Sequence, residues 1–165
     1  MKIRGRAWKY GDDINTDVIY PGKYTYTIKD TSEMAQHALE DLDPSFSKNV
    51  QKNDFVVGGS NFGCGSSREQ AASCLKYAGV AAVIARSFAR LFFRNAINHG
   101  LPVIQCPEAV DSIENMEPIE LDFEKGLIIC SKGTFRFPAM DREILEILEA
   151  GGLIPFTRKK LNISG

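Results

Sequence analysis

Apolar and polar residues along the centre of the chain follow two different periods. Residues 54–58 and 80–85 form apolar runs, and a third run begins at residue 103, as in strands buried on both faces. Between these runs, apolar residues recur at helical spacing from Ser66 onward and again from Ser87, which can cap the second helix. Strands and helices in this order predict a parallel α/β layer whose ligand-binding loops follow the strands.

The flanking segments predict further elements around this layer. Upstream, residues 3–10 indicate a strand, and Asp30 with Glu33 has capping-box spacing for a short helix that stops at Pro44. Downstream of residue 107, short apolar runs alternate with glycines, which is typical of antiparallel strands added to the α/β layer. These runs lie at 119–123, 127–130 and 134–137, followed by a helix at 141–150 and a basic, solvated tail at 158–160.

Composition limits the class of protein. With 165 residues, 44% of them hydrophobic and 25% charged, the chain is predicted to form one globular domain over residues 1–165. No apolar stretch approaches the roughly 18 residues of a membrane span, and no signal-peptide core opens the chain, so we expect a cytoplasmic protein. The net charge of −1 offers no positive field for nucleic acid, which is therefore not an expected partner.

Cysteine spacing predicts free thiols. The four cysteines lie far apart and form no C-x-x-C pair, which argues against a self-contained zinc or iron–sulfur site and against a disulfide framework. They are Cys64, Cys74, Cys106 and Cys130.

Residues 59–70 carry the strongest chemical signal. They read Gly-Ser-Asn-Phe-Gly-Cys-Gly-Ser-Ser-Arg-Glu-Gln, a glycine-rich loop that opens a predicted helix and offers unpaired N–H groups to an anion. A Walker loop is excluded because no Gly-Lys-Ser/Thr follows, and a dinucleotide loop is disfavoured because Arg68 replaces the third glycine. An anionic ligand fits this loop better than a nucleotide phosphate does.

The polar residues at the end of this loop have structural as well as functional interpretations. Ser66 with Glu69, and Ser67 with Gln70, have capping-box spacing, so either serine can be an N-cap and nothing more. Arg68 in a first helical turn opposes the helix dipole, and a substrate carboxylate gripped by its guanidinium would justify that placement. Spacing alone favours the caps.

Three blocks of sequence together resemble one family. The runs Asn61-Phe-Gly-Cys-Gly-Ser-Ser-Arg-Glu69 and Ala85-Arg-Ser-Phe-Ala-Arg90, with Asn95, Asn98 and Gly100-Leu-Pro102, resemble the swivelling domain of the aconitase superfamily. The run Gly11-Asp-Asp-Ile-Asn-Thr-Asp-Val-Ile-Tyr-Pro21 looks like the stretch that opens the small subunit of isopropylmalate isomerases. The blocks lie in family order, and their combination is far more specific than one glycine pattern.

The resemblance implies a three-layer β/β/α swivelling domain and a hydro-lyase that reversibly dehydrates a hydroxy di- or tricarboxylic acid. In this family a 4Fe-4S cluster leaves one iron free to bind the departing hydroxyl as a Lewis acid. The resemblance places that cluster in a large subunit and not in this chain. The chain is therefore expected to be inactive alone and to act in a heterodimer or a dimer of heterodimers.

Site residues follow from the resemblance by position. Ser66 matches the catalytic base, which as an alkoxide removes the proton beside a carboxylate, and Asp17 matches an active-site acidic residue. Ser67 and Arg68 match substrate-binding positions. An alkoxide needs aligned N–H donors and a nearby cation, which the glycine-rich loop and Arg68 are suited to supply. Without the family match, Asp17 reads as part of an ordinary turn.

The loop after the Asn-Thr-Asp block is implied to close over the substituent that distinguishes one substrate from another. Homoaconitases place an arginine where this chain has Tyr26. The Tyr26 ring and the methyl groups of Thr25 and Thr27 suit an isopropyl group, whereas an unpaired carboxylate beside them would be costly to bury. Isopropylmalate is favoured, but Thr25 replaces a common leucine, which leaves citramalate and dimethylmalate open. Lys23 and Lys29 of this loop are cations that a further carboxylate could pair with, so homoaconitate also stays an alternative.

Two other classes of function stay open at this point. Cys64 near a predicted helix N-terminus is a candidate nucleophile, but His37 and His99 are better explained as surface or capping residues than as its base. A small-anion-binding module that uses the loop at 59–65 without any partner is the non-enzyme alternative.

Overall fold

A seven-stranded mixed sheet organises the computed structural model, which describes residues 2–162. Its strand order is β4-β3-β2-β1-β5-β6-β7; β1 to β4 are parallel, and β5 to β7 are added antiparallel. The predicted α/β class is therefore confirmed. The strands are β1 (Lys2–Lys9), β2 (Phe55–Gly58), β3 (Ala82–Ala85), β4 (Val103–Gln105), β5 (Pro118–Asp122), β6 (Leu127–Cys130) and β7 (Gly133–Arg136).

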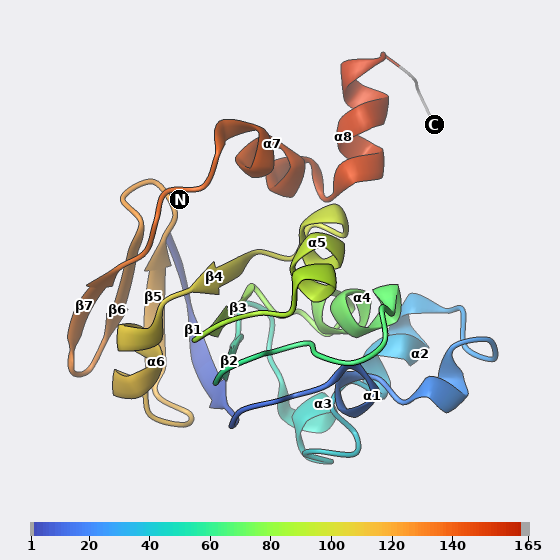
Figure 1. Ribbon diagram of the computed structural model, residues 1–165, viewed down its shortest axis with the longest axis horizontal. Coiled ribbons are helices and arrows are strands. Elements are labelled where there is room, and N and C mark those ends of the chain that lie inside the picture. The colour runs from blue at the N-terminus through green and yellow to red at the C-terminus, as the bar shows by residue number, and fades with distance from the viewer. Residues whose placement is uncertain (1, 163–165) are drawn as a thin grey trace.

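Helices α4 and α5 connect β2 to β3 and β3 to β4, and both cover the same face of the parallel strands. In Figure 1, α4 and α5 lie on the side of the parallel strands opposite to β5–β7, and α7 with α8 packs at the top. The helical elements are α1 (Thr16–Ile19), the 3-10 helix η1 (Gly22–Tyr24), α2 (Thr31–Gln36), α3 (Phe46–Asn49), α4 (Glu69–Tyr77), α5 (Arg90–Asn98), α6 (Pro107–Ser112), α7 (Arg142–Ala150) and α8 (Leu153–Lys160).

Two apolar cores on opposite faces of the parallel strands give the molecule three layers. Successive side chains of a strand point to opposite faces, so Val56 enters the core beneath the helices and Val57 enters the other. Phe92 of α5 belongs to the first core, whereas Leu121 of β5 and Val110 of α6 belong to the second. The β/β/α arrangement that the resemblance implies is confirmed (Figure 1).

The prediction that Ser66 or Ser67 caps a helix is wrong. Helix α4 begins only at Glu69, and its N-cap position is Arg68, whose side chain makes no capping bond. The Ser66 carbonyl, which a helix starting there would use internally, accepts a hydrogen bond from the Thr16 hydroxyl at 2.8 Å. A tertiary contact therefore replaces the first helical turn, and capping does not explain the two serines.

Two other helix boundaries differ from the prediction. Ser87 does not cap α5, because its hydroxyl accepts the Asn61 N–H at 2.7 Å and the helix starts after Ala89. Asp30 does cap α2 by accepting the Ser32 N–H at 3.2 Å, but the helix ends at Gln36, and the chain turns at Leu39 with a positive φ of 57°. Pairing between the loops after β2 and β3 accounts for the first difference.

The predicted basic tail is also helical. Residues 158–160 form the last turn of α8, which is packed on α7 and α5. Helix α6, whose Ala109 and Val110 are buried in the second core, is not among the predicted elements. No helix within residues 2–162 is long and apolar enough to cross a membrane.

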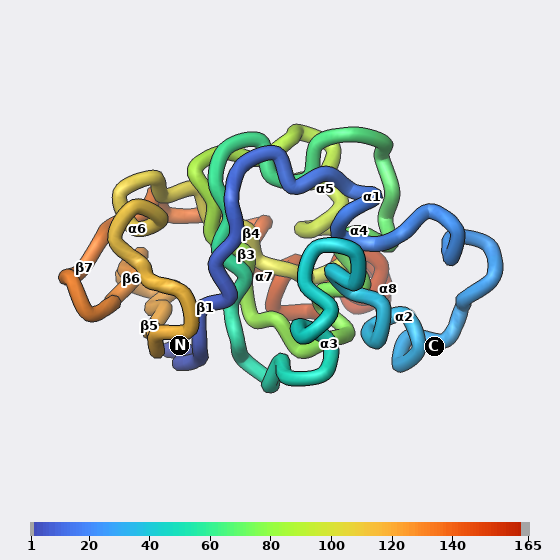
Figure 2. Tube along the Cα trace, turned by 90° about the horizontal axis from the view of Figure 1, so that it is seen from below, coloured from blue at the N-terminus to red at the C-terminus, as the bar shows by residue number. Residues whose placement is uncertain are grey.

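The loops after β1, β2 and β3 meet at one edge of the parallel layer, as the predicted topology requires. Phe62 in the loop after β2 forms an isolated β-bridge with Phe88 after β3, and the Gly59 N–H donates to the Gly11 carbonyl at 2.9 Å. Figure 2 shows the blue segment that follows β1 turning toward the green segment that leads into α4. This edge carries the candidate residues.

Candidate active site

The short helix α1 is bonded to the end of the glycine-rich loop. Gly63 N–H donates to the Ile14 carbonyl at 2.7 Å, and Thr16 N–H donates to the Cys64 carbonyl at 2.8 Å. The Thr16 hydroxyl then reaches the Ser66 carbonyl. Two segments that lie about fifty residues apart in sequence thus form one unit.

Asp17 and Arg68 form an ion pair across this unit. Arg68 Nη1 donates to Asp17 Oδ1 at 2.5 Å, and the Gly22 N–H donates to the same oxygen at 3.1 Å. The hydrogen bond from Arg68, followed by that from Gly22, holds the pKa of Asp17 below its usual range. Arg68 is 24% exposed and Asp17 66% exposed, so both can meet a ligand from solvent. The structure brings together these two residues, to which the resemblance had given separate roles.

Ser66 and Ser67 stand exposed between the loop and α4. Asn95 of α5 donates from its side-chain amide to the Ser67 hydroxyl over 3.5 Å, a long hydrogen bond that brings α5 to the site. The positive end of α4 lies beyond both serines, at Glu69. Arg68 is therefore the cation next to them in the chain, and the helix dipole acts from farther away than the sequence predicted.

The predicted specificity loop follows η1. Tyr26 is 88% exposed, Thr27 is also exposed, and Thr25 is partly buried. Tyr24 anchors the loop by stacking on His37, with ring centroids 4.1 Å apart, and Lys23 Nζ lies 5.1 Å from the Tyr24 ring centroid. The Tyr26 side chain is thus presented to solvent while its neighbours hold the loop.

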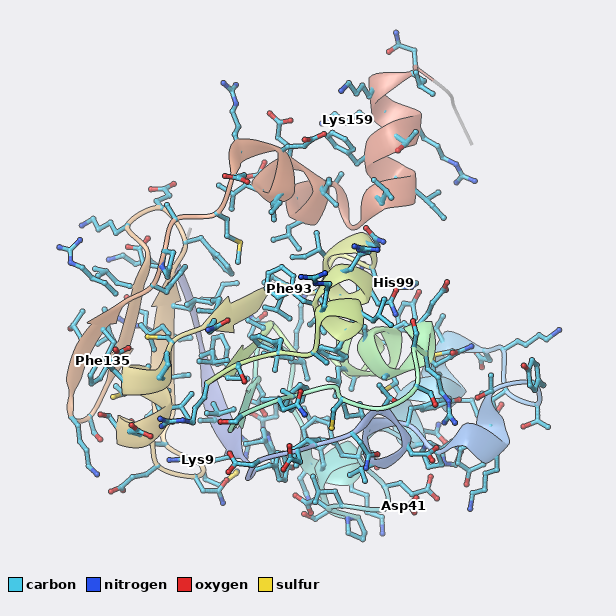
Figure 3. The ribbon with its side chains drawn as sticks, viewed as in Figure 1. Lys9, Asp41, Phe93, His99, Phe135 and Lys159 are labelled. Carbon is cyan, nitrogen blue, oxygen red and sulfur yellow. The ribbon has the colours of Figure 1, made fainter. Side chains whose placement is uncertain are left out.

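The Asp17 side of the site borders an open surface depression. This depression has a volume of roughly 420 Å³ and also borders Gly22. An apolar cavity of roughly 280 Å³ is lined by Phe93, which Figure 3 labels on α5, and by none of the candidate residues. The Asp17–Arg68 pair suits an anionic ligand better than the apolar cavity does, because a guanidinium can bind a carboxylate. The site is open on the side where the serines face solvent.

The cysteine alternative loses its support. Helix α4 starts too late to place its N-terminus at Cys64, and the two histidines are engaged elsewhere. His37 pairs with Glu40 at 2.7 Å, while His99, at the end of α5 (Figure 3), faces Glu69 at 3.5 Å. Within residues 2–162, no cluster of three His, Cys, Asp or Glu side chains is suited to hold a metal, and all four cysteines are free.

Sequence reasoning missed two residues that build this site. Thr16 was read only as part of a block, and its buried hydroxyl gave no separate signal. Gly22 lies directly against the Arg68 guanidinium, a long-range approach that no local pattern reveals.

One family model covers most of the chain and defines its class. The family model described as the aconitase C-terminal domain matches residues 10–109, which include the parallel strands β2 to β4 and both halves of the site. The chain is 49% identical over 98% of its length to a 3-isopropylmalate dehydratase small subunit of Aquifex aeolicus, 97% of which is covered. It is 53% identical over 93% of its length to small subunit 1 of that enzyme from Archaeoglobus fulgidus, 96% of which is covered.

A solved structure agrees with these relatives. The crystal structure of 3-isopropylmalate dehydratase from Methanocaldococcus jannaschii superposes with a TM-score of 0.92 at 44% identity, covering 99% of this chain and 97% of that one. The chain belongs to the family of 3-isopropylmalate dehydratase small subunits.

Proposed function

We propose that this chain is the small subunit of a hydro-lyase that interconverts 2-isopropylmalate and 3-isopropylmalate, a step of leucine biosynthesis. The Asp17–Arg68 pair beside Ser66 carries this proposal, because it places a carboxylate-binding cation next to the serine that matches the family's base. Near-full-length relatives of that name support the same reaction.

Each site residue then has a defined task. Arg68 binds a substrate carboxylate through its planar guanidinium, with Ser67 as a second donor. Ser66 removes the proton beside that carboxylate and holds it at Oγ until rehydration returns it. Asp17 keeps the guanidinium in place, and the hydrogen bonds that it accepts from Arg68 and Gly22 favour its anionic form and hold its pKa below the usual range.

The open site supports a requirement for a partner. A dehydration site must exclude bulk water, yet Ser66 and Ser67 face solvent in this chain. A large subunit that covers this edge would close the site, and the relatives' designation as small subunits implies such a partner. The 4Fe-4S cluster that would supply a Lewis acid belongs, in this proposal, to that large subunit.

Isopropylmalate is the proposed substrate. The exposed Tyr26 ring, with the methyl groups of Thr25 and Thr27, offers an apolar surface to the isopropyl group once the loop faces the substrate. Citramalate and dimethylmalate are the alternatives of the same class. The free cysteines suit a reducing compartment, so a cytoplasmic location is part of the proposal.

Reconstitution tests the function. Turnover of 2-isopropylmalate should be absent with this chain alone and with the cognate large subunit alone, and should appear when the two are mixed under anaerobic conditions. Sedimentation should show a heterodimer or its dimer. Turnover by the isolated chain, or tight binding of isopropylmalate to it by calorimetry without any activity in the mixture, would contradict the proposal and favour an anion-binding module.

A further inference from the structure

Thr16 joins α1 to the backbone of Ser66. Its side-chain hydroxyl donates a hydrogen bond of 2.8 Å to the Ser66 carbonyl, and its backbone N–H donates one of 2.8 Å to the Cys64 carbonyl. The residue is 3% exposed, one of few buried polar residues in the described chain. The buried hydroxyl thus binds a single carbonyl in a segment fifty residues away in sequence.

The backbone around Ser66 is not fixed by local sterics. Gly63 and Gly65 have positive φ angles of 83° and 99°, and α4 begins only at Glu69. Glycine moves freely between backbone regions, so the direction of the Ser66 side chain depends on bonds from elsewhere. Thr16 supplies such a bond to Ser66 itself.

This bond fixes a whole peptide unit. Because the peptide between Ser66 and Ser67 is planar, holding the Ser66 carbonyl toward Thr16 also sets the direction of the Ser67 N–H. Gly65 makes the approach feasible, since a Cβ atom at that position would lie 3.3 Å from the Thr16 hydroxyl oxygen. The hydroxyl, the glycine and the carbonyl therefore form one packed contact.

We propose that Thr16 is a positioning residue for the reaction: its hydroxyl sets the orientation in which Ser66 meets the substrate proton. The inference rests on the proposed function, in which Ser66 is the base. Under this proposal, Thr16 affects the rate of the chemical step and therefore kcat, whereas Arg68 binds the substrate. A purely structural Thr16 would support folding and leave turnover per folded enzyme unchanged.

A pair of variants separates these roles in the reconstituted complex. Thr16→Ser and Thr16→Ala both remove the methyl group and differ only in the hydroxyl. Misplacing a reacting group by about 1 Å can cost on the order of 100-fold in rate, so we expect Thr16→Ala to lower kcat by about 10- to 100-fold with KM within about twofold. Thr16→Ser should keep kcat within about threefold of the parent, because it retains the donor. Thr16→Val, which preserves shape, should behave like Thr16→Ala.

Controls keep this inference apart from the proposed function. Ser66→Ala is measured in parallel, and adding Thr16→Ala to it should cause no further loss. Equal kcat values for Thr16→Ser and Thr16→Ala, measured on folded complexes, overturn the role of Thr16 even if Ser66→Ala is inactive. If Ser66→Ala retains turnover, the proposed function of Ser66 fails first. If Thr16→Ala does not fold, Thr16→Val is compared with the parent, because valine and threonine have the same shape and differ only in a methyl group in place of the hydroxyl.

Discussion

Gly22 lies against the guanidinium group of Arg68, and a Cβ atom at Gly22 would come within 2.6 Å of Arg68 Nη1. The same glycine donates its N–H to Asp17 Oδ1, the oxygen that Arg68 also binds. Each of the three residues Gly22, Asp17 and Arg68 therefore contacts the other two. The absence of a side chain at residue 22 lets the loop approach so closely.

Gly22→Ala should displace the Arg68 side chain and weaken substrate binding. Its backbone needs no positive φ, so the added methyl acts through contact with Arg68 and not through strain. Charge-assisted hydrogen bonds contribute about 1.5–3 kcal/mol, and we expect kcat/KM to fall about tenfold, mainly through KM. Gly11→Ala is the matched control, because nothing lies within 4 Å of a Cβ there. Equal kinetics for the two variants would argue against a role for this contact.

Tyr26→Arg should shift substrate selectivity. Tyr26 is 88% exposed, so the change should leave the melting temperature unaltered, while the new cation can pair with the extra carboxylate of homoaconitate. The ratio of kcat/KM for homoaconitate to that for isopropylmalate should rise about tenfold, or roughly 1.4 kcal/mol. Tyr77→Arg, also on an exposed tyrosine but at the end of α4, should leave the ratio unchanged. A parent enzyme that already prefers homoaconitate would refute this assignment of the loop.

Asp54 should contribute strongly to stability. It is 2% exposed and accepts hydrogen bonds from Arg6 Nη2 at 3.0 Å, Trp8 Nε1 at 2.9 Å and Gln51 N–H at 2.9 Å. Removing one partner of a buried pair costs about 3–5 kcal/mol, so Asp54→Ala should lower the unfolding free energy by about 3 kcal/mol or more. Glu114→Gln, which breaks the exposed pair with Lys132, should cost at most about 1 kcal/mol.

The pH dependence of this effect has a defined sign. Burial by itself would raise the pKa of Asp54, but the hydrogen bonds from Arg6, Trp8 and Gln51 outweigh it and hold the pKa below its usual range. A folded-state pKa below the unfolded one stabilises the protein above the unfolded value, about 3.9, and this contribution disappears as the pH falls through the folded pKa. The stability difference between parent and Asp54→Asn should therefore be full at pH 7 and shrink below about pH 4. A difference independent of pH would contradict this account.

Much of the fold could be predicted because it depends on local patterns. The apolar runs of β2 and β3, and the left-handed glycines Gly79 and Gly100 after α4 and α5, were each readable in sequence. Helix α6 could also have been predicted, since Pro107 stands in its first turn. The strand order was not predictable, because β5 pairs with β1 across more than a hundred residues.

The candidate site was predictable by resemblance but not by geometry. Capping-box spacing assigned Ser66 to a helix, yet a bond from Thr16 keeps it outside α4. Nothing local indicates that Asp17 meets Arg68 or that Gly22 adjoins its guanidinium. Such contacts between distant segments exist only once the loops after β1 and β2 are brought to one edge of the sheet.

Ser66→Ala in the reconstituted complex tests the central claim most directly. A positioned general base contributes about 10²- to 10⁴-fold, so kcat should fall by about 10³-fold. Because Ser66 caps no helix, the unfolding free energy should change by at most about 0.5 kcal/mol. Ser60→Ala, which changes an exposed serine at the other end of the same loop, should retain full turnover. If the Ser66→Ala complex keeps most of its turnover while it remains folded and assembled, Ser66 is not the base and the account is contradicted.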